Sequence, residues 1–310
     1  MFLVRWLISC CARRRPAASP SISGGESFGA ISNFLPANFN PATATITLLA
    51  GRGLYPLLAA RRILATGMRL CLIASEDADE ALMELFPKNR RARYNAGQIG
   101  KLLNRLEEYG STHALMAGQV APKRLFHGLR FDVTAIRLLA SLRRRNAETI
   151  FGALAAAVER RGVELLDARC FMDQDLAIAG FMGQHRPRID QLDHGIAIAR
   201  AVAALDIGQG IVQRRGTVLA VEGFDGTDRM LRRCAEFATD RKWFIKTSKP
   251  GQDFRFDVPV VGWRTLDAMD RGGIGAMAVE AGSTILLDKE RLIAEANGRK
   301  IGIFGYGGDP

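Results

Sequence analysis

The sequence predicts an α/β protein of two domains. Short β-like runs alternate with helix-like runs along most of the chain, and glycines and a proline interrupt this alternation once, within residues 177–188. The 310 residues are enough for two domains of modest size. Apolar residues make up 48% of the chain and charged residues 24%, which is typical of a globular protein with a sizeable core.

The first half alternates regularly, which indicates a parallel or mixed sheet flanked by helices and hence a Rossmann-like N-terminal domain. The β-like runs are residues 45–49, 69–74, 113–116 and 163–166, and the helix-like runs are residues 57–65, 99–109, 136–145 and 149–161. This domain is expected to span residues 45–176.

The second half predicts a mixed α/β domain over residues 177–310, because a hairpin-like pair interrupts the alternation of strands and helices. The β-like runs are residues 211–213, 217–222, 243–246, 258–261, 275–279, 285–287 and 301–304, and the helix-like runs are residues 189–205, 228–237, 265–270 and 289–297.

Residues 1–44 differ from both domains. The apolar run at 1–9 precedes the arginines at 13–15, which is the reverse of the order in a secretory signal, and Ser, Pro, Gly and Asn dominate up to Asn40. We expect a disordered tail over residues 1–44. A peripheral membrane hook is the alternative.

Composition excludes several function classes. There is no apolar run of eighteen residues, so no transmembrane helix is expected. The five cysteines form no C-x-x-C motif, and their odd number does not suggest a framework of disulfide pairs, which favours a reducing cytoplasm. Four histidines without a Cys/His cluster disfavour zinc, so any metal is expected to be held by oxygen. The net charge of +11 suggests a polyanionic substrate, an anionic membrane surface or nucleic acid. Sparse aromatics and the lack of a nucleic-acid-binding motif argue against nucleic acid.

A glycine-containing turn lies at the first strand-to-helix junction. Gly51, Arg52 and Gly53 follow the strand, and backbone N–H groups in such a turn, beside a helix N-terminus, favour a phosphate. Pro56 stands where a dinucleotide fingerprint has its third glycine, which argues against NAD. A purely structural turn is the alternative.

Two further polar residues of the first half are candidates for substrate binding. Lys101 lies at the start of a helix after Gly97 and Gly100, where an ammonium group and a helix N-terminus act on the same anion. Gln119 follows the strand at 113–116, and its amide is suited to pairing with a base edge. For Lys101, an exposed side chain in the first helical turn is the alternative.

Acids and bases gather in the second half. Glu222 and Asp228 belong to a Gly-containing turn after a β-like run, and Lys246, Lys249 and Asp257 follow on nearby segments. Acids that hold a hard cation, beside bases that hold phosphate oxygens, are what phosphoryl-transfer chemistry needs. The alternatives are a polar loop, a helix cap at Asp228 with Thr227, a strand-end surface residue at Glu222 and exposed lysines.

Several linked motifs of this half resemble one family. They are LDIGQG at 205–210, AVE at 220–222, GTD at 226–228, Lys246, KP at 249–250, DVP at 257–259 and EAG at 280–282. They resemble the LpxI family, the Mg-dependent UDP-2,3-diacylglucosamine pyrophosphatases of lipid A biosynthesis. The resemblance runs from about Ile46 to Tyr306, and the turn at 51–56 and the segments around Lys101 and Gln119 are similar to family motifs as well.

This resemblance implies a cytoplasmic enzyme, peripheral at the inner membrane, that splits UDP-2,3-diacylglucosamine into UMP and 2,3-diacylglucosamine 1-phosphate. Asp257 is then the essential ligand of Mg, with Asp228 and Glu222 as further metal candidates. Lys246 and Lys249 are expected to neutralise charge on the pyrophosphate.

The resemblance also implies a set of substrate contacts, the last of which belongs to the GTD motif: Gly51, Arg52, Gly53, Lys101, Gln119 and Thr227. The chain departs from the family at Asn146, where relatives often have an acid. Two rival interpretations remain: another nucleotide-sugar or dinucleotide enzyme, and a non-catalytic protein that binds a nucleotide-linked lipid.

Overall fold

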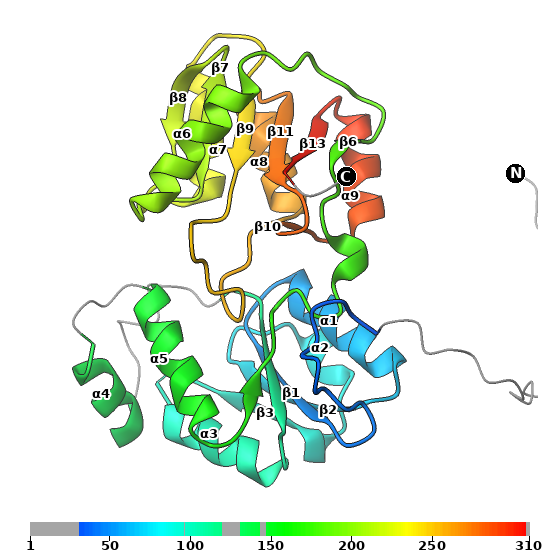
Figure 1. Ribbon diagram of the computed structural model, residues 1–310, viewed down its shortest axis with the longest axis vertical. Coiled ribbons are helices and arrows are strands. Elements are labelled where there is room, and N and C mark those ends of the chain that lie inside the picture. Colours follow the sequence, from blue (N-terminus) through cyan, green and yellow to red (C-terminus); the bar gives the residue numbers. More distant parts are fainter. Residues whose placement is uncertain (1–30, 96, 120–130, 143–146, 308–310) are drawn as a thin grey trace, which may run out of the picture. The chain divides into compact units, whose positions relative to one another are not determined.

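The computed structural model describes residues 31–95, 97–119, 131–142 and 147–307, all of which belong to one compact unit. Within these residues the fold is α/β, as predicted, with one large sheet in each half of the sequence and a two-stranded sheet in the second half (Figure 1). No helix of the described ranges combines the length and the apolar character needed to cross a bilayer.

The first domain contains a five-stranded parallel sheet with the strand order β3-β2-β1-β4-β5, which is Rossmann-like. Its strands are β1 Thr45–Ala50, β2 Arg69–Ser75, β3 Arg91–Tyr94, β4 His113–Ala117 and β5 Glu164–Leu165. Its helices are α1 Leu54–Ala65, α2 Glu80–Glu84, α3 Ile99–Glu108, α4 Val133–Ala140 and α5 Ala147–Glu159.

Helices cover both faces of this sheet, which explains why its central strands are apolar throughout. Leu48 of β1 packs with Ile63 of α1 in one core, and the next residue, Leu49, packs with Leu103 of α3 and Val158 of α5 in another. Successive strand residues point to opposite faces, so one continuous apolar run supplies two cores.

The second domain contains a six-stranded mixed sheet with the strand order β6-β13-β11-β9-β7-β8. Its central strands β9, β11 and β13 are parallel, whereas β7, β8 and β6 pair antiparallel with their neighbours. The strands are β6 Gly180–Met182, β7 Gly210–Arg214, β8 Thr217–Val221, β9 Trp243–Lys246, β11 Ala276–Glu280 and β13 Gly302–Tyr306, with β10 Val260–Val261 and β12 Ile285–Leu286 as a separate parallel pair.

Four helices cover this sheet: α6 Leu192–Ala204, α7 Thr227–Arg233, α8 Trp263–Arg271 and α9 Lys289–Gly298. Ile245 of β9 packs with Ile196 of α6. Phe244 packs on the other face with Met230 of α7 and Leu266 of α8. The ends of β7, β8 and β9 thereby come together, and these ends bear the predicted acids and bases.

The prediction of a disordered tail up to residue 44 is wrong for residues 31–44. Phe34 and Phe39 pack against the core of the first domain, and the Phe171 backbone N–H donates to the Ser32 hydroxyl over 3.1 Å. The Ser-, Pro- and Asn-rich composition suggested that the loss of conformational entropy on ordering this segment would be too large. Burial of its aromatic side chains offsets that loss.

Three elements were not predicted: α2, β3 and the edge strand β6, each five residues long or shorter. The helix expected at 136–145 begins earlier, at Val133, because the Asp132 side chain accepts a hydrogen bond from the Ala135 N–H over 2.8 Å and so caps the helix. The described part of this helix ends at Ala140, and residues 143–145 of the expected helix lie outside the described residues.

Candidate active site

Asp257 lies in the segment between β9 and β10, and two amide groups fix its position. The Gln209 side-chain amide donates to Asp257 Oδ2 over 3.1 Å, and the Gln252 side chain donates to the Asp257 backbone carbonyl over 2.6 Å. The Asp257 N–H in turn donates to the Asp253 carbonyl over 3.0 Å. The carboxylate is therefore oriented by Gln209, and its backbone is fixed by Gln252 and Asp253 of the preceding loop, as a metal ligand or a base requires.

Lys246 ends β9 and lies beside Glu222, which follows β8. Lys246 Nζ is 3.8 Å from Glu222 Oε2, and the Thr227 hydroxyl donates to Glu222 Oε1 over 2.5 Å. Lys246 and Glu222 are only 10% and 15% exposed in their side chains, so the pair is weakly screened by solvent. Glu222 therefore positions the Lys246 ammonium, and Thr227 positions Glu222.

Lys249, three residues further, has two acidic partners. Its ammonium contacts Glu148, in the first turn of α5, and lies 3.5 Å from Asp206 Oδ1. The segment that follows Lys249 also contacts α5, through an ion pair of Arg255 with Glu159 and a stacked pair of Phe256 and Phe151. The lysine is thus fixed by side chains from the LDIGQG stretch and from the first domain.

Close backbone packing holds Gln209 in place. A Cβ atom on Gly208 would overlap the Glu222 carbonyl, and one on Gly210 would lie 2.7 Å from Glu222 Oε2. The Thr247 N–H donates to the Gln209 carbonyl over 3.0 Å. Glycine on both sides of Gln209 therefore allows the strand ends of β7, β8 and β9 to approach one another closely enough for Gln209 to contact Asp257.

The charges of the site alter two pKa values. Burial raises the pKa of Asp257, and the hydrogen bond from Gln209 and the charges of Lys249 and Lys246 oppose this rise without cancelling it. For Lys249, burial acts to lower the pKa, but the hydrogen bond to Glu148 and the nearby carboxylates outweigh it, so the pKa is raised. Burial therefore disfavours the ionised form of Asp257, whereas the acids around Lys249 favour the charged form of that lysine.

The three predicted metal ligands do not form one cluster. Among the described residues, no three or more His, Cys, Asp or Glu side chains are placed to hold a metal ion together. Glu222 Oε2 is buried without a hydrogen bond, but its nearest charged partner is Lys246, and Asp228 lies in the first turn of α7. Mg usually takes one or two carboxylates together with substrate phosphates and water, so Asp257 fits it as a protein ligand.

The glycine turn of the first domain forms where β1 and β4 end. The Arg52 N–H donates to the Gln119 carbonyl over 2.9 Å, and the Gln119 N–H donates to the Arg52 carbonyl over 3.0 Å. A Cβ atom on Gly51 would lie 2.5 Å from the Gln119 carbonyl oxygen. Gly53, with a φ of 104°, precedes α1 and has open space around its Cα. The structure thus brings four predicted residues together: Gly51, Arg52, Gly53 and Gln119.

Lys101 lies elsewhere, exposed in the first turn of α3. The N-terminus of this helix already has an anionic partner, because the Gly100 N–H donates to Asp132 Oδ2 over 2.7 Å. The same carboxylate caps α4 through its other oxygen. The helix N-terminus that was expected to act with Lys101 on a phosphate is therefore occupied by a side chain of the protein itself.

Gln209 and Glu148, like Gln252 and Asp206, contact the predicted site although no role was expected for them. Gln209 belongs to the LDIGQG stretch, and its position between two glycines is the signal that could have identified it. Glu148 lies two residues beyond Asn146 and supplies an acid to Lys249. Asn146 itself lies outside the described residues.

The chain thus has two α/β domains, with a glycine turn at the strand ends of the first and a half-buried Asp257 near two lysines in the second. Residues 45–174 match the model of the LpxI N-terminal domain, and residues 179–304 match the model of the LpxI C-terminal domain. The chain is also 30% identical over 277 residues to UDP-2,3-diacylglucosamine pyrophosphatase LpxI of Caulobacter vibrioides, across 85% of this chain and 97% of that protein. The chain belongs to the LpxI family.

Proposed function

We propose that this protein hydrolyses the pyrophosphate bond of UDP-2,3-diacylglucosamine and releases UMP and 2,3-diacylglucosamine 1-phosphate. The observation that supports this most is that both LpxI domains are matched in order, and that a relative named for this activity aligns over 97% of its length. Lys246 and Lys249 lie close enough to Asp257 to affect its pKa, which is consistent with chemistry on a pyrophosphate.

In this proposal the two lysines bind the pyrophosphate oxygens and stabilise the charge that develops as the bond breaks. Glu222 keeps Lys246 in position, and Glu148 and Asp206 do the same for Lys249. Thr227, expected from sequence to touch the substrate, acts through Glu222, because its hydroxyl is donated to that carboxylate.

We propose Mg as the cofactor, held by Asp257 together with phosphate oxygens of the substrate. The ion would polarise the pyrophosphate and lower the pKa of a bound water. Gln209 orients the Asp257 carboxylate through Oδ2. The Glu222 carboxylate contacts the Lys246 ammonium and accepts a hydrogen bond from the Thr227 hydroxyl. Glu222 and Asp228 are therefore candidates for the metal only if the substrate-bound protein rearranges.

The glycine turn is proposed to bind the nucleotide part of the substrate. Gly51 lets the two segments of the turn meet, and its N–H already donates to the Ala117 carbonyl. The groups proposed to contact the nucleotide are therefore the exposed backbone of Gly53 at the start of α1, the Arg52 guanidinium and the Gln119 amide. Lys101 is proposed as a further contact for a phosphate, through its ammonium alone.

We further propose a cytoplasmic protein in peripheral contact with the inner membrane, because the substrate is a lipid and the chain has a net charge of +11.

The test is the release of UMP from UDP-2,3-diacylglucosamine by the purified full-length chain. Release should stop with a chelator and return with Mg. Turnover that is unaffected by chelation would refute the role of the metal. Tight substrate binding without any UMP would favour the non-catalytic alternative, and a saturable change in NADH fluorescence would favour a dinucleotide enzyme.

A further inference from the structure

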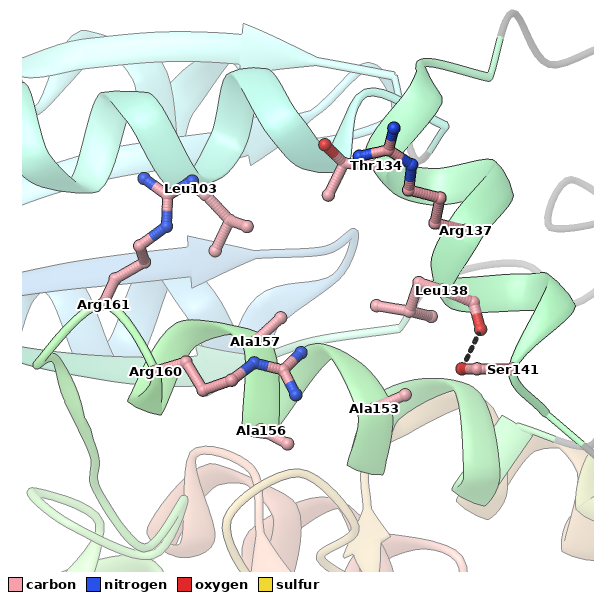
Figure 2. Close-up of a pocket in the computed structure, with 10 residues that line it drawn as sticks. All are labelled: Leu103, Thr134, Arg137, Leu138, Ser141, Ala153, Ala156, Ala157, Arg160 and Arg161. Atoms are coloured by element: carbon pink, nitrogen blue, oxygen red, sulfur yellow. Dashed lines mark hydrogen bonds between the residues drawn. The ribbon is translucent and has the colours of Figure 1, made fainter.

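A cavity of about 590 Å³ lies among α3, α4 and α5 of the first domain (Figure 2). Its walls are largely apolar, with Leu103 from α3, Leu138 from α4, and Ala153 and Ala157 from α5. None of these side chains belongs to the glycine turn or to the site around Asp257. The proposed reaction therefore leaves the cavity without an assigned role.

Three arginines surround these apolar side chains: Arg137, Arg160 and Arg161 (Figure 2). Arg161 contacts Glu107, whereas none of the described residues that line the cavity is acidic. The two acids near the ends of α5, Glu148 and Glu159, have lysine and arginine partners on the segment around Asp257. The cavity therefore has an excess of positive charge.

The side of α4 that does not line the cavity adds exposed apolar surface next to Arg137. Val133 is 61% exposed and Ile136 is 55% exposed. They lie three residues apart, hence on one side of the helix, and Arg137 is adjacent to Ile136. Large aliphatic side chains that stay exposed beside cations are typical of a surface that enters the headgroup region of a bilayer.

We propose that this surface, named here the α4–α5 face and formed by Val133, Ile136, Arg137, Arg160 and Arg161 with the apolar cavity, docks on an anionic lipid bilayer. The arginines bind lipid phosphates, and the two aliphatic side chains insert among the headgroups. The proposal rests on the membrane contact proposed above and assigns it to a surface. The five named residues of this face form no ion pair or hydrogen bond with Lys246, Lys249 or Asp257, although α5 also carries Glu148, which contacts Lys249. Docking is therefore expected without substrate and without Mg.

The test measures co-sedimentation of the full-length chain with vesicles. Vesicles with a third of phosphatidylglycerol should bind the protein, pure phosphatidylcholine vesicles should not, and high salt should release it. Arg137→Gln with Arg160→Gln should lower the partition coefficient about tenfold or more, since each cation near an anionic surface contributes separately. Val133→Ser with Ile136→Ser should lower it by a similar factor.

A matched control changes the same residue types in the second domain: Ile189→Ser, where the side chain is 45% exposed, with Arg232→Gln. The control variant should bind vesicles as the wild type does. Every variant should have the circular dichroism spectrum of the wild type and should release UMP from detergent-dispersed substrate at the wild-type rate. Full vesicle binding by the arginine pair variant would overturn the proposal. A rise in KM for dispersed substrate without loss of vesicle binding would also overturn it, because the cavity would then hold the acyl chain of the substrate.

Discussion

The glycine turn of the first domain and the lysine site of the second are both proposed to bind the same substrate, but they are built differently. The turn is formed by the backbone: Arg52 and Gln119 pair through their N–H and carbonyl groups, and Gly51 lies against that pair. The lysine site is formed by side chains, with Asp257 held by Gln209 and each lysine held by carboxylates.

This difference predicts which substitutions matter in each region. Where backbone groups bind, the sensitive change is the addition of a Cβ atom, because it prevents two chain segments from meeting. Where charged side chains act, the sensitive change is the removal of a charge, because its buried partners lose their compensation.

The largest effect is expected at Asp257. Asp257→Ala removes the proposed Mg ligand, and we expect UMP release to fall at least about a hundredfold, or about 3 kcal/mol of transition-state stabilisation. Asp257→Asn keeps one oxygen and should fall between the two. Substrate binding should persist in both. A folded Asp257→Ala protein within tenfold of the wild type would contradict the role given to this carboxylate.

The next effect is expected at Lys246. Lys246→Met should lower UMP release at least about tenfold, because it removes a charge from the pyrophosphate. It should also lower the free energy of unfolding by about 1–3 kcal/mol, because it leaves the buried Glu222 without compensation. Adding Glu222→Gln should restore the melting temperature but not the activity. If the double variant regained activity, Lys246 would be needed only for stability.

Gly51→Ala tests the backbone region. The new Cβ atom would lie 2.5 Å from the Gln119 carbonyl oxygen, so the two segments have to separate. We expect a loss of about 1–3 kcal/mol of stability and a raised KM, measured by denaturant unfolding and UMP release. Gly275→Ala is the control, since no atom lies within 4 Å of its added Cβ. Equal behaviour of the two variants would mean that the turn tolerates side chains.

The smallest effect concerns pH. The folded pKa of Asp257 is raised by burial, so the folded protein binds this proton more tightly than the unfolded chain does. Its contribution to stability is therefore present below the unfolded pKa and is lost as pH rises through the folded pKa. Asp257→Asn, which does not titrate, should melt at a higher temperature than the wild type near neutral pH, and this gain should shrink in acid.

Asp253→Asn supplies the opposite sign four residues away. Its hydrogen bonds to Arg255 lower the pKa of Asp253, so the ionised form stabilises the fold above the unfolded pKa. Asn at this position should lower the melting temperature near neutral pH. If both variants shifted in the same direction, burial would not be what distinguishes the two carboxylates.

The fold could be predicted largely because the central strands are continuous apolar runs and the longer helices have apolar spacing. Short elements could not be predicted. β3 contains two arginines, a tyrosine and one alanine, and β6 is three residues long, so neither has the apolar pattern of a strand. The packing of residues 31–44 also escaped, because it depends on a few aromatic side chains that meet residues more than a hundred positions away.

The site could be predicted only in part. Motif order identified Lys246, Lys249 and Asp257, which the structure places within mutual electrostatic influence. Sequence cannot show which acid pairs with which base. Glu222 was expected as a metal ligand and instead contacts Lys246, and the helix start near Lys101 is occupied by Asp132, thirty-two residues from the N–H that it accepts.

Gly208 and Gly210 have a consequence for any saturation mutagenesis of this chain. Neither residue has a side chain with which to meet a ligand, yet almost every substitution at either position would push the chain away from Glu222. Because Gln209 lies between them, such a push would be transmitted to Asp257. In a functional screen, substitutions at these two positions would thus reduce activity as strongly as substitutions of the reacting groups. In a substrate-bound structure the two glycines would nevertheless not contact any group that reacts.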